Sequence, residues 1–289
     1  MPKRISTKII RGQNAIDGAG VHLRRVLGIR TIRDFDPFLM LDGFDSIDYH
    51  EYIKGFPWHP HRGIETVTYL ISGEIEHGDS LGNNGVIKDL DCQWMTAGSG
   101  IIHQEMPVKS NRMLGCQLWV NLPQKDKMCN PAYNDIKQND IPFIEEQNAV
   151  IRIISGKYKN TSGALKNHFV QVQYLDVMLN ANSVWEYSET PDNQTLFLYL
   201  LDGTIATDEA LQSFEEKACA ILFKAQSDQE NIFSNVIVKA GENGARFLLI
   251  AAKPLNEPVA WGGPIVMNTE DELNTAFEEL DMGTFIKHK

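Results

Sequence analysis

Residues 56–67 read FPWHPHRGIETV, and this stretch decides the fold. His59 and His61 are one residue apart, so in an extended segment both imidazoles point to the same face. A second pair at the same spacing, His103 and Glu105, follows some forty residues later. The two pairs predict that two neighbouring strands each offer two ligands to one metal ion.

The types of ligand narrow the choice of metal. Three imidazoles and one carboxylate, without a thiolate, suit Fe, Mn, Ni, Cu or catalytic Zn better than a structural zinc site, which favours cysteine. The identity of the carboxylate is an open question. Glu65 has the same parity as the first histidine pair, but four residues of strand place it roughly 13 Å from His61. The symmetry of the two pairs favours Glu105, and a salt bridge from Glu65 to Arg62 is the alternative role.

Composition and charge exclude several classes of function. The chain has 289 residues and a net charge of −11, which argues against nucleic acid or an anionic membrane as a direct partner. No stretch approaches the roughly 20 apolar residues of a membrane span. The first eight residues contain no apolar segment of a secretory signal. The four scattered cysteines form no C-x-x-C pair, so we expect free thiols and a cytoplasmic location.

Short β-branched and aromatic runs, separated by turn residues, predict an all-β protein of the sandwich or barrel type. Early strands are expected at 21–28 and 36–45, a first series runs from Thr66 to Leu122, and a second begins at Val150. Residues 123–147 resemble a linker, which predicts domains at 1–135 and 145–289. Residues 269–280 predict a helix, because Thr269 and Glu272 have the spacing of a capping box.

The chain repeats one pattern. Residues 66–75 and 196–205 both have a buried strand, a glycine turn and a short strand. No H-x-H precedes the second copy, and its only nearby histidine is His168. The fold is therefore expected to be duplicated, while the metal site is expected only in the first copy.

Four motifs carry a family resemblance. Residues 59–67, 93–107, 117–122 and 263–269 resemble the pirin family of the cupin superfamily, and the match runs from about Gly18 to Thr269. The resemblance implies two consecutive cupin jelly-roll domains with one metal, iron above all, in the first. Copper, nickel, manganese, zinc and cobalt suit the same ligands. The metal ligands implied by position are His59, His61, His103 and Glu105. The general cupin pattern instead has its carboxylate where Glu65 stands.

The resemblance also implies functions. Several pirin-like proteins resemble quercetin 2,3-dioxygenases, which open the central ring of a flavonol with O₂ and release carbon monoxide. The expected partners are then a small aromatic substrate and O₂, with Glu105 as the catalytic base. The alternative is a regulatory cofactor whose metal redox state tunes binding to a protein partner. A third interpretation is a metal enzyme whose substrate is not a flavonoid. The sequence shows no interface stripe, which favours a monomer.

Overall fold

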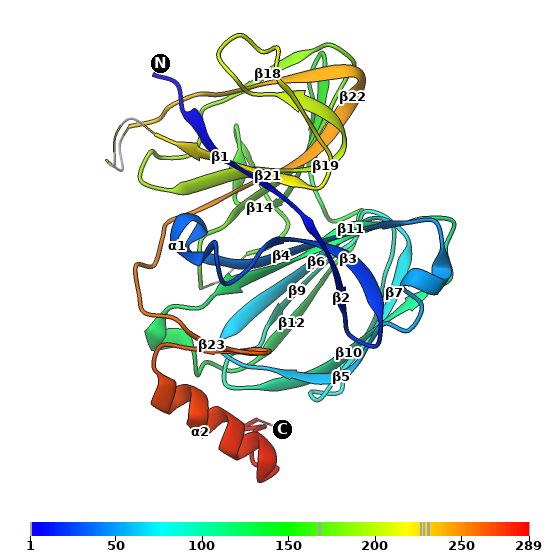
Figure 1. Cartoon of the computed structure of the whole chain (residues 1–289), viewed down its shortest axis with the longest axis vertical. Coiled ribbons are helices and arrows are strands. Elements are labelled where there is room, and N and C mark those ends of the chain that lie inside the picture. Colours follow the sequence, from blue (N-terminus) through cyan, green and yellow to red (C-terminus); the bar gives the residue numbers. More distant parts are fainter. Residues whose placement is uncertain (1, 167–168, 226, 228, 230–231, 289) are drawn as a thin grey trace. The chain divides into compact units, whose positions relative to one another are not determined.

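The computed structural model describes residues 2–166, 169–225, 227, 229 and 232–288. The described chain is mostly β-strand, as predicted (Figure 1). It divides into two compact units. We call residues 14–32, 37–138 and 255–289 the histidine unit, and residues 1–13, 33–36 and 139–254 the apolar unit. His168, the histidine expected near the second copy, lies outside the described residues.

Each end of the chain belongs to the other unit than the predicted division at 1–135 and 145–289 implies. The first strand, β1 (Ile5–Arg11), pairs with β21 (Cys219–Lys224) of the apolar unit (Figure 1). The last 35 residues belong to the histidine unit. There Val266 donates its backbone N–H to the carbonyl of Arg62. Backbone pairing at each end is the physical reason for this placement, because an unpaired strand edge would leave its polar groups without partners.

The histidine unit contains two main antiparallel sheets. The larger has seven strands, in the spatial order β12 (Ala132–Ile136), β9 (Cys92–Thr96), β6 (Ile64–Ser72), β11 (Met113–Asn121), β4 (Phe38–Ser46), β3 (Val21–Leu27) and β2 (Gln13–Asp17). The smaller has the order β5 (Phe56–His61), β10 (Ile101–Val108), β7 (Glu74–Asp79) and β8 (Asn84–Ile87). Two 3₁₀ turns, Tyr49–Glu51 and Gln124–Asp126, and the hairpin of β23 (Ala260–Gly262) and β24 (Ile265–Met267) complete the unit's β framework.

The apolar unit is built on one nine-stranded sheet. Its main path is β1, β21, β19 (Thr195–Ala206), β22 (Val236–Ala252), β17 (Gln173–Leu179), β14 (Ala149–Ser155) and β13 (Phe143–Glu145), with β18 (Val184–Tyr187) on β22 and β20 (Phe214–Glu216) on β19. A small hairpin joins β15 (Lys157–Tyr158) to β16 (Thr161–Ser162). The short helix α1 (Ile32–Phe35) places Phe35 edge-on against Phe197, with ring centroids 5.3 Å apart.

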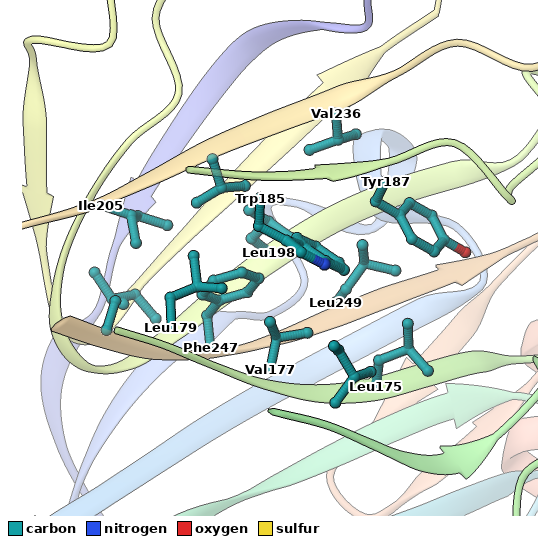
Figure 2. Close-up of a cluster of buried hydrophobic side chains, with 14 of the residues drawn as sticks. Leu175, Val177, Leu179, Trp185, Tyr187, Leu198, Ile205, Val236, Phe247 and Leu249 are labelled. Atoms are coloured by element: carbon teal, nitrogen blue, oxygen red, sulfur yellow. The ribbon is translucent and has the colours of Figure 1, made fainter. Parts of the chain in front are cut away.

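The core of the apolar unit fills its interior with aliphatic and aromatic side chains. Figure 2 shows Trp185 among Leu198, Phe247 and neighbouring aliphatic residues, and the Trp185 and Phe247 ring centroids are 5.9 Å apart. All of these side chains are buried. Burial of this apolar surface, at roughly 25 cal/mol per Å², is the main source of the unit's stability.

Several expectations can be compared with the observed elements. Residues 123–147 were predicted as a linker. The boundary between the two units falls inside this range, at residues 138 and 139, but the range also contains β12, which pairs with β9, and β13, which pairs with β14. Backbone pairing at a sheet edge needs no alternating apolar pattern, so the sequence did not reveal these two strands. The predicted helix is α2 (Glu270–Asp281), and its capping box between Thr269 and Glu272 is present. All four cysteines are free. Among the described helices, none is both long and apolar enough to cross a membrane.

Candidate metal centre

Strands β5 and β10 bring the three histidines together. The strands are antiparallel neighbours, and His103 lies directly opposite His59. His59 Nε2 and His61 Nε2 are 3.1 Å apart. One ring nitrogen from each of His59, His61 and His103 lies within 4.8 Å of the other two. Two neighbouring strands thus bring the three predicted imidazoles together, and within the described part of the chain they could hold a metal ion.

Backbone carbonyls fix the orientation of two of the rings. His59 Nδ1 lies 2.9 Å from the carbonyl of Pro57, and His61 Nδ1 lies 3.1 Å from the carbonyl of Pro264. A carbonyl only accepts, so each Nδ1 donates and each Nε2 keeps a free lone pair. A second nitrogen that donates to a carbonyl is the usual support of a metal-ligating histidine. The two lone pairs are thus available to one cation.

His103 is the third candidate ligand. It is fully buried, and among the described residues neither of its ring nitrogens has a hydrogen-bond partner. Burial lowers the pKa of His103 well below its usual value, with His61, His59 and His77 adding to the effect. Burial, followed by His59, lowers the pKa of His61 to about 3. Both shifts favour the neutral imidazole for His61 and His103, which is the form that binds a metal, and the unpartnered nitrogens of the buried His103 fit a ligand role.

The turn after His61 holds the strand in place. Gly63 has a φ of +77°, and a Cβ there would lie 2.0 Å from the carbonyl oxygen of Val266. The buried ammonium of Lys127 donates to the carbonyls of Gly63 and Val266 and to the side chain of Asn121. Burial lowers the pKa of Lys127 to about 8. Only glycine fits this turn, which ties the histidine strand to the returning C-terminal hairpin.

Arg62 is anchored to the C-terminal segment. Its guanidinium donates to the carbonyls of Ser99 and Phe285, pairs with Glu279 at 2.8 Å and lies over the ring of Phe285. The salt bridge considered between Arg62 and Glu65 is replaced by these contacts. Arg62 follows the candidate ligand His61, so its contacts tie this part of the site to helix α2 and the segment after it.

The two candidate carboxylates lie in different surroundings. Glu105 lies on the same strand as His103 and lines the cavity described below, but it is not one of the three clustered ligands. Glu65 instead accepts hydrogen bonds from Trp94 Nε1 and Thr96 Oγ1 and does not line that cavity. Burial raises the pKa of Glu65. The role of Glu105 as a fourth ligand stays a proposal, and Glu65 is likewise not part of the histidine cluster.

A cavity of about 760 Å³ opens beside the histidines, between the two sheets of this unit. Its walls are largely apolar, and its polar side chains include His59, His61 and Glu105. The aromatic side chains in its wall include Phe56 and Trp119. Trp94 and Met95 are buried in the core, Trp58 is exposed, and neither they nor Met106 lie in its wall. The size suits a ligand of a few fused or linked rings.

Sequence reasoning missed several polar groups of the cavity. Thr68 and Gln117 line the cavity and hydrogen-bond to Glu105. Arg25 and Asp42 form a bidentate ion pair in its wall. The alternation of strands β6 and β11 could have placed Thr68 and Gln117 on the inner face, since each occurs at i, i+2 from another inward residue. His77 is buried, its Nε2 lies 3.3 Å from Asp79 Oδ2, and its ring stacks on Tyr133.

Comparison with known proteins identifies the family. The family model for pirin matches residues 20–120, and the model for the pirin C-terminal cupin domain matches residues 174–286. The chain belongs to the pirin family. A pirin-like protein of Caulobacter vibrioides is 39% identical over 99% of this chain and 100% of that protein. The all-β fold with two cupin-type domains, expected from the resemblance, is thereby confirmed.

Two further relatives carry an enzyme name. A Pseudomonas aeruginosa protein, provisionally named quercetin 2,3-dioxygenase, is 39% identical over 93% of each chain. A crystal structure of quercetin 2,3-dioxygenase from Acinetobacter baumannii superposes with a TM-score of 0.85, at 29% identity, and covers 98% of each chain. Each of these pirin-family similarities extends over both units.

Proposed function

We propose that this pirin-family protein is a metal-dependent dioxygenase that opens the central ring of flavonols such as quercetin with O₂ and releases carbon monoxide. The observation that carries the proposal is the cluster of His59, His61 and His103 beside a largely apolar cavity whose wall includes His59, His61 and Glu105. The similarity to proteins named quercetin 2,3-dioxygenase gives the substrate class.

The ion would be held by His59, His61 and His103, with Glu105 as the proposed fourth ligand. When bound, a first-row transition metal supplies Lewis acidity and a site for chemistry with O₂. The donor set suits iron first, and copper, nickel, manganese, zinc and cobalt are also compatible. No cysteine belongs to this group of ligands.

The protein's own groups bind and orient the substrate. The aromatic and aliphatic wall, including Phe56, Met40 and Trp119, excludes water from a flat ring system. A buried carboxylate beside a hydroxyl can take its proton, so Glu105 is the proposed general base for the flavonol 3-hydroxyl. Each oxygen of Glu105 accepts a hydrogen bond, one from Thr68 and one from Gln117, which restrains the orientation of the proposed base.

An oxygen-electrode assay with quercetin tests the proposal. The metal-loaded protein should consume quercetin and O₂ and release carbon monoxide. Glu105→Gln should lower kcat by about 10² to 10⁴, the usual contribution of a general base. His61→Ala should abolish activity. His22→Ala is the matched control, because it removes an exposed imidazole of the same unit. Unchanged quercetin with the iron-, copper- and nickel-loaded forms would reject the proposal.

The regulatory alternative, in which the metal's redox state tunes binding to a protein partner, stays a prediction. The cytoplasmic location and the monomeric state likewise stay predictions, and no contact described above favours the regulatory role over the enzyme.

A further inference from the structure

A chain of hydrogen bonds runs through the cavity wall to Glu105. Trp119 Nε1 donates to Gln117 Oε1 at 3.2 Å, and Gln117 Nε2 donates to Glu105 Oε2 at 2.7 Å. Thr68 Oγ1 donates to the other carboxylate oxygen, Oε1, at 2.8 Å. All four side chains line the cavity. We call Trp119, Gln117 and Thr68 the carboxylate cradle.

The polarity of the cradle is fixed by chemistry. An indole N–H can only donate, so the amide oxygen of Gln117 must face Trp119. The amide nitrogen then faces Glu105 and also lies 3.1 Å from Thr68 Oγ1. With that hydroxyl accepting from the amide, its own hydrogen is left for Glu105. Every donor in the cradle is therefore directed toward an acceptor, and the chain of hydrogen bonds ends at the carboxylate oxygens of Glu105.

Strand register explains why the cradle can form. Thr68 on β6 lies directly opposite Gln117 on β11, and Trp119 follows Gln117 on the same face at i+2. Glu105 comes from β10 of the other sheet, so the cradle joins the two sheets across the cavity. A carboxylate fixed through both oxygens loses the rotational freedom that a glutamate side chain otherwise keeps.

We infer that Gln117 is a positioning residue for the metal centre, which restrains the Glu105 carboxylate beside the histidines, and that Trp119 sets the direction of its amide. This inference rests on the proposed metal site but not on the substrate. Removal of the cradle should change how Glu105 meets a bound metal, even when no flavonol is present. Partners of this kind commonly cost 10- to 100-fold in metal affinity or activity when they are lost.

The test is the electron paramagnetic resonance spectrum of the full chain loaded with one equivalent of Cu(II), without flavonol. Gln117→Met keeps the length of the side chain but removes the donor, and Thr68→Val keeps the shape but removes the hydroxyl. We expect both to shift the copper hyperfine splitting. Both should also lower kcat on quercetin by about 10- to 100-fold, with KM changing less.

Trp94→Phe is the matched control. It also removes one hydrogen-bond donor from a buried carboxylate, but that carboxylate is Glu65, which does not line the cavity. Its copper spectrum should equal that of the wild type. If Gln117→Met fails to fold, Thr68→Val decides the matter. Spectra of the folded variants that superimpose on the wild type, or a wild-type protein with no histidine-bound copper signal, overturn the inference. Shifted spectra without any quercetin turnover sustain it and reject only the flavonol reaction.

Discussion

The two units use the same strand arrangement for opposite purposes. In the histidine unit, Thr68 on β6 lies opposite Gln93 on one side and Gln117 on the other. By the repeat, its counterpart on β19 is Leu198, which lies opposite Ile221 and Leu249. Three adjacent polar positions of one interior are thus aliphatic in the other, and all three aliphatic residues belong to the apolar core.

The strand before each repeat shows the same contrast. His59 and His61 lie at i, i+2 on β5, ahead of β6, and Trp185 and Tyr187 lie at i, i+2 on β18, ahead of β19. The imidazoles of the first pair converge on an open cavity, whereas Trp185 and Tyr187 stack with ring centroids 5.6 Å apart in a closed core (Figure 2). The interior of the histidine unit thus contains candidate metal ligands and a cavity, whereas the interior of the apolar unit is filled by packed apolar side chains.

The largest expected effect is on packing in the apolar unit. Trp185→Ala should lower the free energy of unfolding by about 3–5 kcal/mol, because it leaves a large cavity among buried side chains. Metal content per folded chain should stay at the wild-type value. Calorimetry and metal analysis of the same sample check both statements. Loss of metal from the folded variant would break the separation between the two interiors.

A transplant of one polar position should also be costly. Leu198→Thr puts the residue of the histidine unit into the apolar core, where neighbouring strands offer Ile221 and Leu249. The lost apolar volume and a buried hydroxyl with only backbone partners should together cost about 2–4 kcal/mol. Denaturant unfolding measures it, with Val184→Thr at an exposed position of β18 as the control. A cost below about 0.5 kcal/mol would show that the two interiors tolerate the same residues.

The opposite change in the histidine unit should be nearly neutral in the metal-free protein. His103 is buried and its ring nitrogens lack partners among the described residues, so His103→Leu removes a desolvation cost of about 1–3 kcal/mol. The melting temperature of the metal-free variant should equal or exceed that of the metal-free wild type. A clear fall would mean that the imidazole is satisfied without a metal.

The smallest expected effect concerns the direction of one amide. Trp119→Phe removes the N–H that orients Gln117 and keeps most of the ring, so the amide can turn over and lose its donor to Glu105 part of the time. We expect quercetin kcat to fall about 2- to 10-fold, less than for Gln117→Met, as for the weaker losses among supporting groups. A larger fall than in Gln117→Met would place the role in the indole itself.

The sequence predicted the parts of the site that are local in the chain. The i, i+2 spacing predicted that His59 and His61 come together, as they do. The lack of an H-x-H before the second copy predicts a metal site in the first copy alone, and this stays a prediction. The spacing of Thr269 and Glu272 predicted the cap of helix α2. Each of these signals depends on a short periodicity that one strand or helix turn imposes.

The remainder depends on contacts that no local pattern records. The carbonyl that orients His61 belongs to Pro264, 203 residues away. Glu105 and the residues of its cradle come from three strands. The alternation of side chains along each strand predicts which face of the sheet a residue occupies, but not which residue of another strand it contacts. The placement of the chain ends depends on edge pairing, such as that of β1 with β21. Such pairing uses backbone groups alone, so it leaves no pattern in the side chains.

We propose that the chain binds its metal in only one copy of the duplicated fold. Anomalous X-ray diffraction from crystals of the metal-loaded full chain tests this proposal. We expect one strong anomalous peak per chain, within about 2.0–2.3 Å of a ring nitrogen of each of His59, His61 and His103. A peak bound by residues of the apolar unit, or no peak at the three histidines in protein that retains its metal, would contradict it.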